Sequence, residues 1–240
     1  MSTFNQRGVY HYNELLHEGH RFLEKRFPSA LWHGDPLRPE IALTFDDGPS
    51  LRDLDAILRT LDAHGAVATF FFIGAKVAAA AALVRAVAAA GHQIGMHGYR
   101  HRPFTSLKPT LLRLELRLAQ TLISRICGWE RERVRDIRPP FGVFTPTTLA
   151  LLERWHYRAV MWSLVPFHWR FAAELSFEQV RRRVTAGSLI VLHEDMSDGP
   201  TIVELLDHTL PIVRQAGLRT VTVEDMWRAR DATSQHSELS

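Results

Sequence analysis

The pattern that most constrains the fold of this chain is an alternation of short apolar segments with longer segments of helical spacing. Seven short segments are rich in β-branched and aromatic residues: Ile41–Phe45, Val67–Ile73, His92–Met96, Arg135–Arg138, Arg158–Trp162, Ser188–Leu192 and Arg219–Val223. Between them, apolar residues recur every three or four positions in Leu51–Ala63, Ala75–Ala90, Leu107–Ile126, Thr147–Arg154, Phe177–Val184 and Thr201–Gln215. Strands that alternate with helices in this way predict βαβ units and a parallel sheet, as a barrel or as an open doubly wound sheet.

The length and composition favour a single globular domain of the α/β class. The chain has 240 residues, of which 46% are hydrophobic and 23% charged, which excludes a wholly disordered or collagen-like protein. No Ser/Gly-rich linker divides it. We predict a helical lead-in over residues 1–39 with a helix at Asn13–Phe27, a main domain over residues 40–228, and a flexible tail over residues 229–240.

Several classes of protein are excluded by simpler features. Cys127 is the single cysteine, so an intrachain disulfide scaffold is excluded. The first twenty residues contain no apolar core of a secretory signal, and no uncharged apolar run is long enough for a transmembrane segment, so we expect a cytoplasmic protein. The net charge is +3, and no aromatic residues interleave the arginine clusters, so we expect solvated helix faces and no nucleic-acid binding. The sequence does not indicate the oligomeric state.

Polar residues that could take part in binding or catalysis follow four of the predicted strands. They are Asp46-Asp47-Gly48-Pro49, the segment from His97 to Pro103, Arg138-Pro139-Pro140-Phe141-Gly142, and His193-Glu194-Asp195. In parallel α/β folds, ligands bind at the carboxyl ends of the strands. We therefore expect these four segments to converge on one site.

The residue types in that site predict metal-assisted hydrolysis. Two imidazoles, His97 and His101, together with one aspartate form a common ligand set for a catalytic zinc or a non-haem iron. A second carboxylate could act as a general base, His193 as a general acid, and Arg138 as the partner that orients a carboxylate. The alternative for each motif alone is structural, with the aspartates capping a turn or helix and the histidines hydrogen-bonded to backbone carbonyls.

These motifs resemble those of a known family. The segment Thr44-Phe45-Asp46-Asp47-Gly48-Pro49-Ser50 is identical to the first motif of the polysaccharide deacetylases, the NodB-homology domains of carbohydrate esterase family 4. His97 and His101 followed by Pro103 resemble the second motif, Arg138–Gly142 the third and Leu192-His193 the fifth. The resemblance spans about residues 40–225 and implies a distorted (β/α) barrel of seven to eight parallel strands.

The resemblance implies a role for each residue of the site. Asp47, His97 and His101 would bind a divalent metal, first of all Zn²⁺, with Co²⁺, Ni²⁺ and Fe²⁺ as alternatives. Asp46 would be the base that activates water, oriented by Arg138, and His193 would protonate the leaving amine.

The same resemblance implies four substrate-binding residues, which are Pro140, Phe141, Trp169 and Leu192. The backbone N–H near Phe141 would supply part of an oxyanion hole. Leu192 and Trp169 would line a small pocket for the acyl group, although Trp169 as a plain core tryptophan is the competing interpretation.

Two positions depart from the family pattern. Gly98 replaces the Ser or Thr that usually follows the first histidine of the second motif, and His168 replaces the aspartate of the fourth motif, which pairs with the catalytic histidine. We therefore expect a pKa of His193 that is not raised by pairing and is lowered by a neighbouring imidazolium. Glu194, Asp195 and Asp198 are candidate replacements for the missing carboxylate.

The leading functional hypothesis is a metal-dependent hydrolase that removes an N-acyl group, most simply acetyl, from an amino sugar or oligosaccharide. One alternative is a deformylase of a lipid-linked amino sugar or a cyclic-amide hydrolase on the same barrel. A second alternative, motivated by His168, is a metal-binding or glycan-binding protein without catalysis.

Overall fold

The fold is known from a computed structural model that describes residues 19–168, 173–194 and 202–238. In these residues, seven strands form one sheet: β1 (Glu40–Asp46), β2 (Thr69–Phe72), β3 (Gln93–Met96), β4 (Asp136–Ile137), β5 (Arg158–Ala159), β6 (Leu189–His193) and β7 (Arg219–Val221). Each strand coincides to within one residue with part of a predicted apolar segment. All pairings are parallel, which confirms the predicted α/β class.

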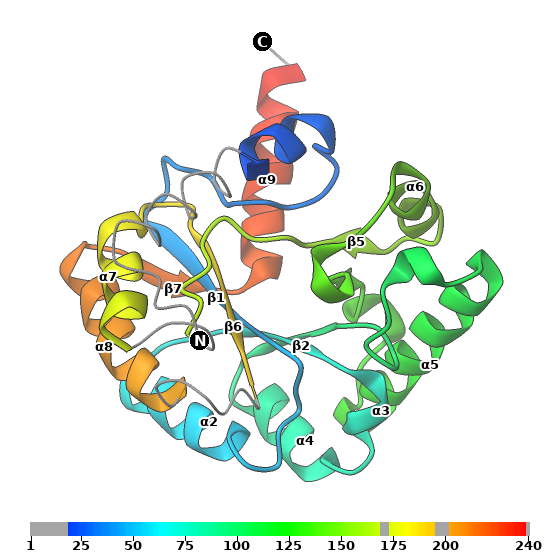
Figure 1. Ribbon diagram of the computed structural model, residues 1–240, viewed down its shortest axis with the longest axis horizontal. Helices are drawn as coiled ribbons and strands as arrows, with labels where there is room; N and C mark the ends of the chain where they lie inside the picture. Colours follow the sequence, from blue (N-terminus) through cyan, green and yellow to red (C-terminus); the bar gives the residue numbers. More distant parts are fainter. Residues whose placement is uncertain (1–18, 169–172, 195–201, 239–240) are drawn as a thin grey trace, which may run out of the picture.

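The sheet curls into an open, distorted barrel, as predicted. Its strand order is β5-β4-β3-β2-β1-β6, and β7 also pairs with β1. Isolated parallel bridges, Leu31 to Val160 and Leu164 to Ile190, extend the pairing at the two edges. Figure 1 shows β1 and β6 near the centre of this curled sheet.

Eight helices follow the strands in the described residues: α2 (Leu54–Ala63), α3 (Gly74–Val77), α4 (Ala81–Ala89), α5 (Pro109–Cys127), α6 (Pro146–Arg154), α7 (Ala173–Arg183), α8 (Ile202–Gln215) and α9 (Val223–Glu238). Helices α2, α3, α4, α5 and α8 lie around the outer side of the curled sheet (Figure 1). The predicted helix Ala75–Ala90 is two helices, because residues 78–80 form a turn. The alanine-rich run has no apolar periodicity that could mark this break. No helix within the described ranges is both long and apolar enough to cross a lipid bilayer.

Two hydrophobic layers enclose the sheet. Phe45, Phe70 and Leu192 belong to the larger layer, between the sheet and the helices. Leu189 and Phe71 belong to a smaller cluster inside the curl of the sheet. The alternation along each strand produces these two layers, because successive side chains of a strand point to opposite faces.

The described residues of the two terminal segments pack against the main domain or continue its last helix. In the predicted lead-in, residues 19–26 are helical, and Leu31 and Trp32 are buried in the core. The Leu31 N–H donates to the Ala159 carbonyl, which ties the segment to the end of β5. Residues 229–238, expected within a tail, continue helix α9.

Candidate active site

The four polar segments converge at the carboxyl ends of neighbouring strands. Asp46 ends β1 and lies opposite His193, the last residue of β6. His97 follows β3 and Arg138 follows β4, and these two strands lie on the other side of β2. The parallel direction of the strands places all of these residues at one edge of the sheet.

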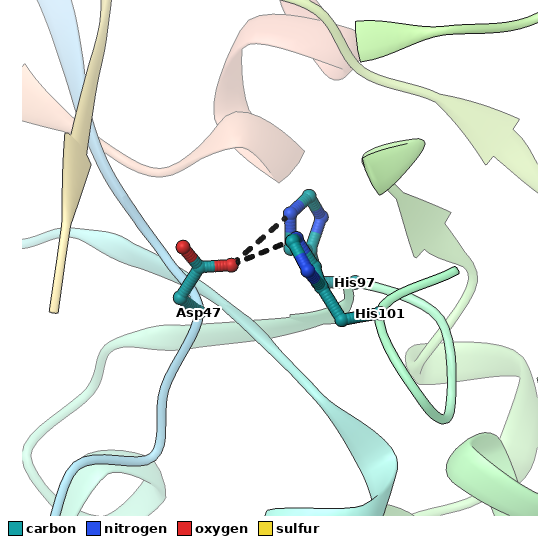
Figure 2. Close-up of side chains that lie close together, drawn as sticks. All are labelled: Asp47, His97 and His101. Atoms are coloured by element: carbon teal, nitrogen blue, oxygen red, sulfur yellow. Dashed lines mark ion pairs between the residues drawn. The ribbon is translucent and has the colours of Figure 1, made fainter. Parts of the chain in front are cut away.

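Asp47, His97 and His101 form a three-residue cluster with one donor atom each. The Asp47 Oδ1 lies 3.0 Å from the His101 Nε2 and 3.5 Å from the His97 Nε2. All three donor atoms lie within 4.8 Å of one another. Figure 2 shows the Asp47 carboxylate oxygen directed at both imidazole rings. Asp47 (φ 70°) and His101 (φ 52°) have left-handed backbone conformations, which turn their side chains away from the regular strand direction.

The hydrogen bond on the far side of His97 leaves its Nε2 available to a ligand. The His97 Nδ1 lies 2.7 Å from the Arg138 carbonyl oxygen and must donate to it. The ring is 3% exposed, and burial lowers its pKa to about 3 against the opposing attraction of Asp47. A neutral imidazole with its second nitrogen fixed by a carbonyl is the usual arrangement of a histidine that binds a metal.

The Asp47 carboxylate is suited to a cation for a complementary reason. Burial acts to raise its pKa, but the hydrogen bond from His101 and the attraction of His97 and His193 outweigh burial, so the pKa is lowered. Its buried Oδ1 faces the Nε2 atoms of both imidazoles. A buried, ionised carboxylate oxygen beside two imidazole nitrogens fits a divalent metal of the zinc type.

The second aspartate, Asp46, is held by a buried arginine. The Arg138 Nη1 donates to the Asp46 Oδ1 at 2.8 Å and to the Thr44 Oγ1 at 2.7 Å, while its Nη2 donates to the Met161 carbonyl at 2.7 Å. Arg138 is fully buried, and Asp46 is 2% exposed. Burial raises the pKa of Asp46, and the attraction of Arg138 opposes this shift without cancelling it. The other oxygen, Oδ2, lies 4.0 Å from the His97 Nε2, on the side of the ligand cluster.

His168 lies beside His193, at the position where the family pattern has an aspartate. The ring centroids are 6.2 Å apart, and the His168 Nε2 accepts the backbone N–H of His193 at 3.1 Å. Burial lowers the pKa of His168 to about 3, so its ring is neutral instead of the imidazolium that we expected. The pKa of His193 is lowered by burial, with Asp46 and Asp47 acting in the opposite direction.

The third motif forms the rim of the site as a short 3₁₀ turn, η3 (Pro140–Gly142). Phe141 is 62% exposed with φ 61°, and its ring centroid lies 4.5 Å from that of His101. Pro140 is buried against Gly98. Gly98 has φ 74°, a conformation that favours glycine over the Ser or Thr of the family pattern.

The two residues assigned to an acyl pocket have different outcomes. Trp169 lies outside the described residues. Leu192 is fully buried in the layer between the sheet and the helices, next to Phe45 in the strand register, and its place in an acyl pocket stays a prediction. Alternation along β6 places Val191, and not Leu192, on the same face as His193.

Two contacts that hold the Asp46–Ser50 loop were not recognised in the sequence. The Lys76 Nζ donates to the Asp47 carbonyl at 2.8 Å. Glu194, which is 1% exposed, accepts the Ser50 N–H at 2.7 Å and donates its own N–H to the Asp46 carbonyl at 3.0 Å. A Cβ atom at position 48 would collide with the Glu194 carboxylate, so this loop requires a glycine there.

Glu194 therefore contacts the loop through its Oε2 and its backbone N–H, and its role as a substitute for the fourth-motif acid stays a prediction. Asp195 and Asp198, the other candidate substitutes, lie outside the described residues. Lys76 had no motif to mark it, whereas Glu194 was singled out in the sequence as an acid directly after the candidate catalytic histidine, but for a different role.

Comparison with known proteins agrees with this geometry. The chain is 29% identical over 195 residues to the peptidoglycan-N-acetylglucosamine deacetylase of Bacillus cereus, covering 80% of this chain and 69% of that protein. It is 28% identical over 189 residues to the chitooligosaccharide deacetylase of a Bradyrhizobium species, covering 74% of this chain and 85% of the relative. The crystal structure of the Bc1960 peptidoglycan N-acetylglucosamine deacetylase superposes with a TM-score of 0.76 at 29% identity, covering 81% of this chain and 91% of that chain.

A family model described as polysaccharide deacetylase matches residues 33–160, just over half of the chain. The matched region contains the aspartate pair, both histidines of the ligand cluster and Arg138. The relatives named above are deacetylases, which are hydrolases of carbon–nitrogen bonds other than peptide bonds. The chain belongs to the polysaccharide deacetylase family.

Proposed function

We propose that this protein is a metal-dependent deacetylase that removes the acetyl group from N-acetylglucosamine units of a glycan. The observation that carries the proposal is the placement of Asp46, held by Arg138, against the Asp47, His97 and His101 cluster. Two relatives are named for peptidoglycan N-acetylglucosamine and for chitooligosaccharides as the groups that they deacetylate, and these names support this class of substrate.

Asp47, His97 and His101 would hold the metal through one carboxylate oxygen and two Nε2 atoms. A divalent ion at this position would polarise the amide carbonyl and lower the pKa of a water molecule towards neutrality. Two imidazoles and one carboxylate favour Zn²⁺, and the same donors also accept Co²⁺, Ni²⁺ or Fe²⁺.

Asp46 is the residue best placed to accept a proton from the attacking water. Arg138 fixes its Oδ1 at 2.8 Å, which leaves Oδ2 on the side of the ligand cluster. A carboxylate whose pKa is raised by burial is a stronger base than an exposed one, which favours proton transfer near neutral pH.

His193 would return a proton to the nitrogen of the sugar. In the complete reaction, water adds its oxygen to the acetyl carbon, the carbon–nitrogen bond breaks, and acetate and a free amine leave. The backbone N–H at Phe141, in the exposed η3 turn, is the proposed hydrogen-bond donor to the developing oxyanion. Because His168 is neutral, it supplies no negative charge that would hold the proton on His193.

The test is acid release from a panel of acylated sugars by one preparation whose metal content is also measured. Chitooligosaccharides and peptidoglycan fragments should release acetate, chelation should abolish the release, and Zn²⁺ should restore it. Formyl sugars and cyclic amides in the same panel test the alternative reactions. Metal and sugar binding without release of any acid would contradict the proposal and favour a binding protein.

A further inference from the structure

Helix α5 has a second apolar stripe that the fold does not use. Leu111, Leu114 and Leu118 are 38%, 54% and 46% exposed, respectively. Their spacing of three and four residues aligns them along one side of the helix. The side that packs in the core is formed by other residues, among them Leu112 and Leu116. The exposed leucines therefore do not contribute to the hydrophobic core of this protein.

Basic residues accompany this leucine stripe. Lys108, at the start of α5, and Arg113, Arg117 and Arg125 are all exposed. The one acid of the helix, Glu115, is buried and paired with Arg102. The exposed face of α5 thus combines apolar side chains and positive charge with no carboxylate of its own.

We propose that this face, called here the α5 face and defined by Leu111, Leu114, Leu118, Arg113 and Arg117, docks on an anionic lipid bilayer. An amphipathic helix of this composition buries its leucines at the boundary of the acyl chains and pairs its cations with lipid phosphates. The proposal goes beyond the deacetylase reaction and does not depend on it.

The charge of the α5 face argues against a second copy of the chain as its partner. In any contact between two α5 faces, the arginines of one copy would find no carboxylate on the other copy. Like charges in an interface are destabilising, whereas an anionic bilayer provides a phosphate for each of them.

The position of the helix gives such docking a consequence for the site. Figure 1 shows α5 on the outer side of the barrel, and the three leucines of the α5 face are exposed. Its first residue, Pro109, follows closely after His101 of the ligand cluster. A bilayer bound along α5 would therefore hold the loop of the second histidine close to the membrane surface.

The test is co-sedimentation of the full chain with vesicles of phosphatidylcholine alone and of phosphatidylcholine with about 30% phosphatidylglycerol. We expect binding to the phosphatidylglycerol vesicles that weakens at high salt. Replacement of Arg113 and Arg117 by Gln should weaken binding about 30-fold, since each basic residue near an anionic surface changes affinity about fivefold. Replacement of Leu111, Leu114 and Leu118 by Gln should weaken it at least tenfold.

The matched control is Leu37→Gln, since Leu37 is 90% exposed but lies outside the α5 face. This variant should bind vesicles like the wild type, and thermal unfolding should show that every variant is folded. Equal binding by the leucine variant and the wild type would overturn the proposal. So would a concentration-dependent dimer that the leucine variant abolishes, in the absence of vesicle binding.

Discussion

The two ends of strand β3 each have a buried histidine, and the two rings carry their proton on opposite nitrogens. Before the strand, the His92 Nδ1 accepts the Ala68 N–H at 3.3 Å, so its proton is on Nε2. After the strand, the His97 Nδ1 donates to the Arg138 carbonyl at 2.7 Å, so its Nε2 carries a lone pair. Both rings are at most 5% exposed and neutral at pH 7. Only the second histidine is therefore prepared to bind a metal.

Two Arg–Asp pairs, each with a buried aspartate, differ in a similar way at the two ends of the sheet. At the amino end of the sheet, Arg158 donates two hydrogen bonds of 2.7 Å to Asp136, and Gln93 donates to the same carboxylate. At the carboxyl end, Arg138 binds one oxygen of Asp46 and leaves the other beside the ligand cluster. A buried ion pair stabilises the fold little by itself, so the carboxylate oxygen that lies beside the ligand cluster marks the functional pair.

The largest effect that this comparison predicts is on turnover. Asp46→Asn removes the base but keeps an oxygen for Arg138, so kcat for acetate release should fall by about 10²–10⁴-fold. Asp136→Asn makes the same chemical change at the other end of the sheet and should leave kcat per folded molecule within about twofold, although Arg158 loses one charged partner and keeps its ion pair with Glu224. A comparable loss of kcat in both variants would contradict the distinction between the two ends.

The second prediction concerns metal affinity. His97→Asn removes the Nε2 donor and should weaken Zn²⁺ binding more than about 100-fold, since even residues behind the ligands change affinity by 10–100-fold. His92→Asn should leave it unchanged, because its ring lies at the opposite end of β3. Competition with a chromophoric chelator measures both constants, and weaker binding in the His92 variant would show that the two ends are coupled.

The third prediction uses the pH dependence of stability at the amino end. The pKa of His92 is lowered by burial from 6.5 to about 4. As the pH falls through 6.5, the unfolded chain gains a proton that the folded chain does not take up, so the protein loses stability between pH 6.5 and 4. The share of His92 in this loss is about 3 kcal/mol.

His92→Asn isolates that share, because Asn keeps an acceptor for the Ala68 N–H and the other histidines titrate in both proteins. The free energy of unfolding of the wild type relative to this variant should decrease by about 3 kcal/mol between pH 7 and pH 4. Urea unfolding at several pH values measures it. If the free energies of unfolding of the wild type and the variant changed equally with pH, His92 would be protonated in the folded state as readily as in the unfolded state.

The smallest effect is expected from the support of the ligand loop. Glu194→Ala leaves the buried Ser50 N–H without its acceptor, which should cost about 1–3 kcal/mol of stability and weaken Zn²⁺ binding about tenfold. Glu194→Gln keeps an acceptor oxygen and should restore most of both. Thermal unfolding of the metal-free proteins separates the contribution of the loop to stability from that of the metal. A Glu194→Ala variant with unchanged stability and unchanged Zn²⁺ affinity would contradict a role of Glu194 in supporting the ligand loop.

Local patterns in the sequence predicted most of the framework. The seven strands and the helices from α2 to α8 follow from short apolar runs and helical spacing, which depend on neighbouring residues only. Helix α9 was missed because its polar sequence, VEDMWRARDATSQHSE, has little apolar periodicity to indicate it. The break between α3 and α4 was missed because alanines fit a helix core, a surface and a turn equally.

The sequence by itself determined the order of strands and helices and the residue types at the strand ends, because period and motif are properties of adjacent residues. Only the tertiary structure decided which nitrogen of each histidine is available, that Leu192 faces away from His193, that His168 is neutral and that Glu194 supports the loop. These outcomes depend on contacts such as Arg138 to Asp46 and Ser50 to Glu194, which join residues 92 and 144 positions apart. Burial and hydrogen-bond partners of this kind exist only once the chain has folded.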